Sequence, residues 1–178
     1  MGTAILIIVA VLVVAVGILL AIAASKPNAF RIERSASIDA PPERVFALID
    51  DFRQWGGWSP WEKLDPDLKR SYSGAASGRG AVYEWQGNNK VGQGRMEIVE
   101  SVPARRVAIK LDFLKPFEAH NIAEFTLEPR SGATRITWAM HGPNLFMSKV
   151  MGTVMNIDRM VGSQFEEGLA NMKALAER

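Results

Sequence analysis

The sequence predicts an α+β fold in which a curved antiparallel sheet is covered on one face by a long C-terminal helix. The first observation is a series of segments between residues 30 and 141 in which apolar and polar residues alternate, separated by short turns. Strands joined in this way form an antiparallel meander with one buried face. The second is the stretch 144–177, which holds no proline and carries apolar residues three or four positions apart. This spacing indicates one amphipathic helix of roughly 50 Å, which needs a broad apolar surface beneath it.

The composition excludes several classes of function. The chain has 178 residues, enough for one domain with a core and an appendage. Its 21 basic and 19 acidic residues give a formal charge of +2, and no basic run is interleaved with aromatic residues, so we expect no nucleic-acid partner. The absence of cysteine excludes disulfides, thiolate zinc sites and a cysteine nucleophile. With two histidines and no local carboxylate cluster, we expect neither a metal nor another cofactor.

An uncharged apolar segment precedes the predicted domain. Residues 4–24 are nearly all Ala, Val, Ile and Leu, and a helix of this length crosses roughly 30 Å of hydrocarbon. A secretory signal peptide is the alternative, because Ala-Ile-Ala at residues 21–23 resembles a cleavage site, but its apolar run would be shorter and preceded by a charged region. We therefore predict a membrane anchor at residues 1–25, a linker at residues 26–29 and a domain at residues 30–178.

The basic residues that flank the apolar segment lie only on its C-terminal side, at Lys26, Arg31 and Arg34. The positive-inside rule then places the domain in the cytoplasm. The expected location is the cell membrane, crossed once.

The first strand of the domain is expected where apolar residues alternate from Phe30 to Ile38. Arg34 falls on the same face as these residues. It either sits near an open end of the sheet or contacts a polar part of a ligand. Two prolines and Glu43 then predict the start of a short helix that ends near Asp51.

Three of the five tryptophans lie within seven residues, at Trp55, Trp58 and Trp61. Two glycines and a proline in the same stretch predict a loop. Tryptophans in such a loop either plug one end of a core or line the mouth of a cavity, with the indole N–H as a polar handle. The sequence supports both interpretations.

About six further strands are expected between this loop and the C-terminal helix. Gly, Pro, Asn and Ser cluster at the turns between them. The expected strands span residues 68–73, 81–86, 91–102, 107–113, 119–128 and 134–141. The order of one strand, a short helix, these strands and a long helix predicts helices gathered on one face of the sheet.

The predicted C-terminal helix carries five of the eight methionines of the chain, at positions 147, 151, 155, 160 and 172. Methionine is flexible and suits both irregular cores and binding surfaces that adapt to their contents. We expect the helix to close the sheet over an apolar cavity, with the methionines of its first half in the wall. The alternative is a solid core.

The predicted cavity residues are large apolar side chains of the tryptophan-rich loop, the inner face of the sheet and the helix. They are Trp58, Trp61, Tyr83, Trp85, Phe113, Phe125, Trp138, Met140, Met147, Met151 and Met155. Small-molecule sites are mostly apolar with a few polar groups. The polar candidates are Tyr83, Arg34, Asn121 and His120.

Catalytic motifs are sparse. Ser-Gly-Arg-Gly at residues 77–80 lacks the Lys-Ser/Thr pair and the following helix of a phosphate-binding loop, and the chain has no Gly-x-Ser-x-Gly elbow. His120 and Glu124 share one face of a predicted strand, opposite Phe125 and Leu127, which predicts polar residues that face solvent. A histidine becomes a general base here only if the sheet turns it inward. We predict no catalytic residue.

The chain resembles the START-like (SRPBCC) superfamily, and within it the polyketide cyclase/dehydrase and lipid-transport group. The resemblance rests on Ile-Asp-Ala-Pro-Pro-Glu-Arg-Val-Phe at residues 38–46, on Trp-Ser-Pro-Trp at residues 58–61, and on the meander and terminal helix that follow. It covers about residues 31–177. It implies a helix-grip fold, in which a curved antiparallel sheet wraps around the C-terminal helix with a hydrophobic tunnel between them. No catalytic residue of the superfamily carries over to this sequence.

Three functions are consistent with these features. The first is a membrane-tethered domain that binds a lipid or other hydrophobic small molecule, because the tether holds the cavity beside a store of such molecules. The second is a cyclase- or dehydrase-like enzyme in which a histidine or Tyr83 moves a proton, although the few acid and base groups count against it. The third is a protein-interaction domain with a packed core, whose partner the sequence does not name.

Overall fold

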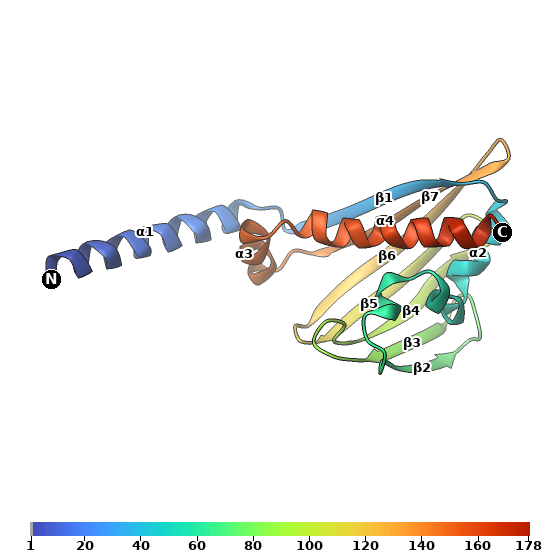
Figure 1. Ribbon diagram of the computed structural model, residues 1–178, viewed down its shortest axis with the longest axis horizontal. Helices are drawn as coiled ribbons and strands as arrows, with labels where there is room; N and C mark the ends of the chain where they lie inside the picture. Colours follow the sequence, from blue (N-terminus) through green and yellow to red (C-terminus); the bar gives the residue numbers. More distant parts are fainter. Residues whose placement is uncertain (1) are drawn as a thin grey trace.

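The computed structural model describes residues 2–178 and contains an antiparallel sheet curved around a C-terminal helix, with an N-terminal helix that projects from one end (Figure 1). Seven strands form the sheet in the order β1-β7-β6-β5-β4-β3-β2. Strands β2 to β7 make the predicted meander, and β1 pairs with β7 at the other edge. The predicted α+β fold is therefore confirmed.

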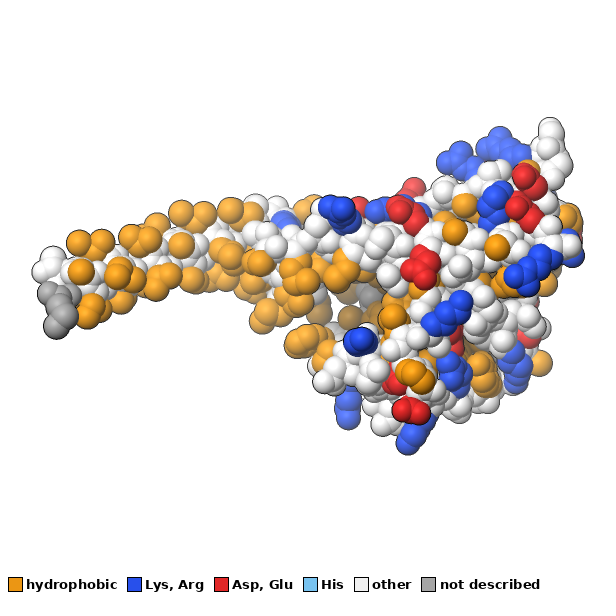
Figure 2. Space-filling view, viewed as in Figure 1, with side chains coloured by type: hydrophobic (Ala, Val, Ile, Leu, Met, Phe, Trp, Pro, Cys, Tyr) orange, Lys and Arg blue, Asp and Glu red, His pale blue; other side chains and the backbone are white. Residues whose placement is uncertain are grey.

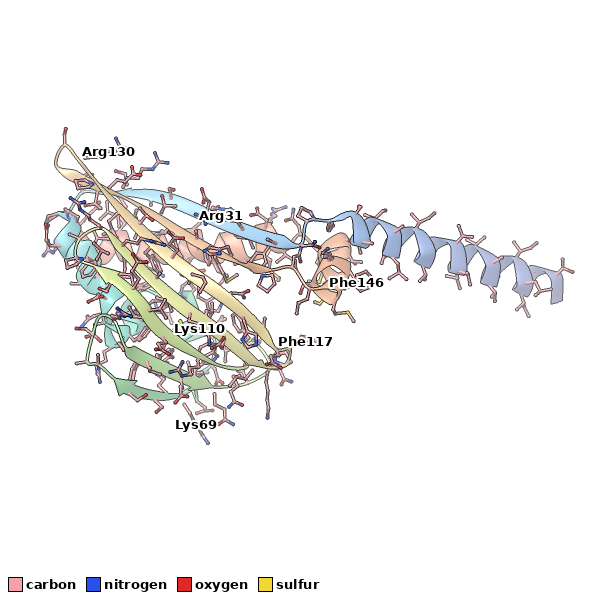
Figure 3. All side chains as sticks on the ribbon, turned by 180° about the vertical axis from the view of Figure 1, so that it is seen from behind. Arg31, Lys69, Lys110, Phe117, Arg130 and Phe146 are labelled. Atoms are coloured by element: carbon pink, nitrogen blue, oxygen red, sulfur yellow. The ribbon has the colours of Figure 1, made fainter. Side chains whose placement is uncertain are left out.

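The strands follow the alternating segments of the sequence closely. Their bounds are β1 Ala29–Ile38, β2 Lys69–Gly74, β3 Ala81–Gln86, β4 Gln93–Val102, β5 Arg106–Lys115, β6 Ala119–Arg130 and β7 Ala133–Pro143. On β5 to β7 the inner face is apolar and buried. The outer face of the sheet carries charged side chains such as Arg31 of β1 and Lys110 of β5, labelled in Figure 3. A strand with this pattern buries every second residue against the layer that covers it.

Helices α2 and α4 and the two 3-10 helices pack on the concave side of the sheet, whereas α1 projects from the domain and α3 lies beside it. Their bounds are α1 Gly2–Ser25, α2 Pro42–Asp50, α3 Phe146–Val154 and α4 Ile157–Ala176, with 3-10 helices η1 Phe52–Gly57 and η2 Pro60–Lys63. Phe165, Leu169 and Met172 of α4 are almost completely buried against the inner face of the sheet. Burial of such side chains contributes about 1.5–3 kcal/mol each and is the main stabilising term of the domain.

The prediction of a single C-terminal helix over residues 144–177 is wrong, because the structure divides this stretch into α3 and α4. The break lies at Met155, which has an extended backbone (φ −121°, ψ 142°). Asn156 then begins α4, since its side-chain oxygen accepts a hydrogen bond from the backbone N–H of Arg159 at 2.9 Å. Helix α4 alone is about 30 Å long and covers the sheet.

The tryptophan-rich loop forms η1 and η2, and two of its tryptophans plug the core. Trp58 is completely buried and its indole N–H donates to the carbonyl of Leu48 at 2.8 Å. Trp55 is buried beside it and donates to the carbonyl of Ile49 at 3.0 Å. Both bonds tie the loop to the C-terminal end of α2.

Helix α1 is long and apolar enough to cross a membrane, a test that a signal sequence also passes. Its side chains are exposed along almost its whole length, except Ala23 near its end, which is buried. Helix α3 packs beside this end of α1, and the two are joined by a hydrogen bond from Lys26 Nζ to the carbonyl of Gly152.

Candidate functional site

An apolar cavity of about 190 Å³ lies between the inner face of the sheet and the first half of α4. Strands β3 to β7, the two 3-10 helices and α4 supply its walls. The lining residues are Trp55, Ser59, Trp61, Glu62, Leu68, Tyr83, Trp85, Val91, Met96, Leu111, Phe113, Ala123, Trp138, Met140, Val161 and Phe165. All but three of these side chains are apolar or tryptophan, so the site favours a hydrophobic occupant.

Stacked aromatic rings form the wall between β7 and α4. The rings of Trp138 and Phe165 are parallel within 9°, with centroids 4.2 Å apart. Trp61 of η2 meets both rings edge-on, at 5.6 and 6.0 Å. Stacked and edge-on contacts stabilise aromatic pairs, so the three rings support one another in this wall.

A glycine allows Trp85 to lie flat against the opposite wall. A Cβ at Gly94 of β4 would lie 2.3 Å from the Trp85 ring and 2.6 Å from the carbonyl oxygen of Asp112. The indole N–H of Trp85 donates to the carbonyl of Val91 at 3.0 Å, which fixes the orientation of the ring. Phe113 of β5 meets the same ring edge-on at 5.9 Å.

One corner of the cavity is polar. The phenol of Tyr83 donates to Glu62 Oε1 at 2.5 Å, and Arg70 Nε donates to Glu62 Oε2 at 2.6 Å. Burial, followed by the hydrogen bond to Glu62, raises the pKa of Tyr83 well above its ordinary value. Tyr83 therefore stays neutral at physiological pH and acts as a hydrogen-bond donor, while Arg70 balances the charge of Glu62.

Six of the predicted cavity residues line the cavity. They are Trp61, Tyr83, Trp85, Phe113, Trp138 and Met140. The other two predicted on the loop and sheet, Trp58 and Phe125, are completely buried behind this wall, where Trp58 packs edge-on against Phe125 at 6.0 Å.

The three predicted methionines lie outside the cavity. Met147 and Met151 are on α3 and Met155 is at the break after it, and their exposed fractions are 64%, 39% and 46%. They miss the cavity because the chain turns at Met155 and places α3 beside α1 instead of over the sheet. The expectation that these methionines form the cavity wall does not agree with the structure.

The sequence contained a signal for some lining residues that were not predicted. Leu111 lies two positions before Phe113 on the same face of β5, and Phe165 belongs to the apolar stripe of the C-terminal helix. Ala123 is equally placed on β6 but is small. Glu62 gave no signal, because no periodicity marks the inward face of the loop that carries it.

The other polar candidates lie away from the cavity lining. Arg34 reaches across to α4 and pairs with Asp158 at 2.9 Å and Glu166 at 2.8 Å, so it fixes the helix on the sheet. His120 is on the outer face, as predicted, where Nδ1 lies 2.7 Å from Asp112. Asn121 is buried on the inner face. Residues 2–178 contain no group of three His, Cys, Asp or Glu side chains able to hold a metal ion.

Comparison with known families decides the family of this chain. A family model described as polyketide cyclase / dehydrase and lipid transport matches residues 29–177. The chain belongs to this family. The match begins at β1 and ends just after α4, so α1 lies outside the family domain. No curated protein matches the chain in sequence.

Solved structures show that the domain of this polyketide cyclase / dehydrase and lipid transport family member has a START-like fold. Protein CV1439 from Chromobacterium violaceum is 19% identical over 86% of this chain and 99% of its own, with a TM-score of 0.59. The di-domain ARO/CYC BexL from the BE-7585A biosynthetic pathway is 15% identical over 89% of this chain and 53% of its own, with a TM-score of 0.64. Ginseng major latex-like protein 151 from Panax ginseng is 10% identical over 85% of this chain and 100% of its own, with a TM-score of 0.62.

Proposed function

We propose that this protein is a membrane-tethered binding domain for a lipid or other hydrophobic small molecule, held in the cavity between the sheet and α4. The observation that carries the proposal is the cavity itself, which is walled by aromatic and aliphatic side chains. The family description includes lipid transport, and α1 is long enough to hold the domain beside a membrane. A cavity in the core argues against the third function, a protein-interaction domain with a solid core.

The size and chemistry of the cavity limit the ligand. A cavity of roughly 150 Å³ lined by apolar side chains holds a benzene molecule, and this one is about 190 Å³. It therefore suits one or two rings, or the end of a longer hydrocarbon chain. Tyr83 and Glu62 already bond each other, so apolar contact and shape provide most of the affinity.

The sharpest test uses the methionines as reporters. Met96 and Met140 line the cavity, whereas Met172 is completely buried in the solid core. Full-length protein carrying ¹³C-methyl methionine in lipid nanodiscs is titrated with naphthalene. Ring currents from bound naphthalene are expected to shift the methyl signals of Met96 and Met140 and to leave that of Met172 in place.

Filling the cavity is expected to abolish these shifts. Ala123→Leu fills it from β6, and Val161→Phe fills it from α4 as an independent second variant. Ala170→Leu, on the exposed side of α4, is the matched control and should bind as the wild type does. An unchanged Met172 signal shows that each variant is folded. Shifts that persist in both filled variants would place the naphthalene elsewhere and overturn the proposal.

A second candidate is proton-transfer catalysis of the cyclase or dehydrase type. The observation that favours it is the neutral Tyr83 phenol beside Glu62 in the cavity corner, a donor and an acceptor able to contact one substrate. Incubation with a linear poly-β-ketone is the test. Ring closure with loss of water by the wild type, and its loss in Tyr83→Phe with naphthalene binding retained, would support catalysis. Unchanged substrate with the wild type would leave binding as the function.

A further inference from the structure

Helix α3 has its polar and apolar residues in the reverse of the arrangement expected in water. Lys149 is its buried residue, and its ammonium donates to Asn28 Oδ1 at 2.6 Å. Met147 and Val154 instead have exposed fractions of 64% and 71%. A helix that faces water buries its apolar side chains and exposes its lysines, so this helix is built for an apolar environment on its outer side.

The exposed apolar side chains gather at one end of the domain. Within residues 2–178 and outside α1, every large hydrophobic side chain that is more than half exposed lies on or just before α3, in the first turn of α4, or in the β5–β6 turn. They are Phe117, Leu145, Phe146, Met147, Val154 and Met160. Figure 3 shows Phe146 and Phe117 at the end of the domain from which α1 leaves, with Arg130 at the opposite end. Figure 2 shows the apolar surface of α1 continuing onto α3.

Hydrogen bonds hold α3 at the base of α1. Lys26, next to the last residue of α1, donates to the carbonyl of Gly152, and the backbone N–H of Asn144 donates to the carbonyl of Asn28 at 2.8 Å. If α1 crosses a bilayer, α3 therefore lies at the bilayer surface. Amphipathic helices at this depth bury their apolar face in the region between headgroups and acyl chains.

The end of the cavity near α1 lies between α3 and Phe117 of the β5–β6 turn. Phe113 is four residues before Phe117, and Val161 is in the first turns of α4, directly after α3. Val91 belongs to the β3–β4 turn, which contacts the β5–β6 turn, since a Cβ at Gly92 would lie 2.2 Å from the carbonyl oxygen of Lys115. A hydrophobic molecule that leaves the cavity at this end meets α3, Phe117 or the surface against which these two lie.

We propose that the apolar face of α3 and the Phe117 turn insert into the interfacial region of the lipid bilayer and hold this end of the cavity against it. The proposal rests on the membrane anchorage in the proposed function. The occupant is a lipid surface because the patch continues the apolar surface of α1 and is fixed to its base. A ligand can then pass between bilayer and cavity without crossing water.

Cysteine scanning with spin labels tests the proposal, because the chain has no cysteine of its own. Met147→Cys places one label on α3, and Phe117→Cys places another in the β5–β6 turn. Ser131→Cys, in the β6–β7 turn at the opposite end, is the aqueous control, and Val13→Cys in α1 is the membrane control. Each full-length variant is reconstituted in vesicles of phosphatidylcholine and phosphatidylglycerol, and collision rates with oxygen and with a water-soluble nickel chelate are measured.

The expected result is an oxygen-to-nickel collision ratio at positions 147 and 117 several-fold above that at 131 and below that at 13. Labels at 147 and 117 that are as accessible to nickel as the label at 131 would overturn the insertion, provided that the label at 13 is in lipid. A label at 13 that is accessible to nickel would instead overturn the anchor, and with it the basis of this inference. Spin–spin broadening at 147 or 117 would identify a second copy as the occupant and would also overturn insertion.

Discussion

At the scale of single residues, Gly94 shows how a missing side chain shapes the cavity. The Trp85 ring and the backbone of β5 occupy the space that a side chain at residue 94 would need. We expect Gly94→Ala to overpack this wall and to lower the free energy of unfolding by about 1–3 kcal/mol, measured by denaturant unfolding. Gly56→Ala is the matched control, because a Cβ there meets nothing within 4 Å. Equal stability of the two variants would contradict the close contact.

His120 provides a second test at this scale. Its hydrogen bond to Asp112 raises the pKa of His120 above the ordinary value of about 6.5. Because the pKa is raised in the folded state, this pair makes its full contribution to stability below a pH of about 6.5. The contribution is lost as the pH rises through the pKa of the folded state. We expect an NMR titration of the His120 ring to have its midpoint above 6.5.

Removal of the partner should reverse that shift. Asp112→Asn keeps the shape of the side chain but removes its charge, so the titration midpoint of His120 is expected to fall. A midpoint that stays unchanged in Asp112→Asn would show that the contact between the two side chains does not control the titration.

At the scale of elements, the break between α3 and α4 decides what each helix covers. Asn156 caps α4 through its side-chain oxygen. We expect Asn156→Ala to lower the free energy of unfolding by about 0.5–2 kcal/mol, whereas Asn156→Asp, which retains an accepting oxygen, should remain close to the wild type. Thermal unfolding monitored by circular dichroism makes the measurement. An Asn156→Ala variant with unchanged stability and unchanged helix content would mean that the break rests on other contacts.

The two sides of this break use the apolar stripe of the sequence differently. Met172 of α4 is completely buried among other apolar side chains, whereas Val154 at the end of α3 has an exposed fraction of 71%. Both residues belong to the stripe with three- or four-residue spacing, but only Met172 covers the sheet. Helical periodicity therefore identifies an apolar face without identifying what that face contacts.

At the scale of the whole molecule, α1 and the domain form a rod and a body, and α3 packs at their junction (Figure 1). We predict that residues 4–24 stay in the mature protein as a membrane span and that the domain faces the cytoplasm, because the flanking basic residues follow the span. Protease added to intact spheroplasts should leave the domain uncut, and protease added after lysis should degrade it. Cleavage in intact spheroplasts would reverse the orientation. A mature N-terminus at Ala24 would identify a signal peptide instead.

The sequence by itself determined the α+β fold, the order of the strands along the chain and most of the inner face of the sheet. The period of two in a strand assigns each residue to one of two faces. The face with the apolar residues points into the core, because folding buries apolar surface. Tyr83, Trp85, Phe113, Trp138 and Met140 were therefore placed correctly on the wall of the cavity.

Only the tertiary structure decided where packed side chains and where a cavity lie between the sheet and the helices that cover it. Trp58 and Phe125 are large and apolar like most of the lining residues, but they pack against each other and leave no space. The pairing of Glu62 with Tyr83 joins a loop to a strand 21 residues later, and no local period encodes such a contact. The turn at Met155, which carries α3 away from the sheet, depends on contacts with the end of α1 as well as on the cap at Asn156. Local sequence fixes which side of an element is apolar, whereas the distance and direction to its partner arise from packing of the whole chain.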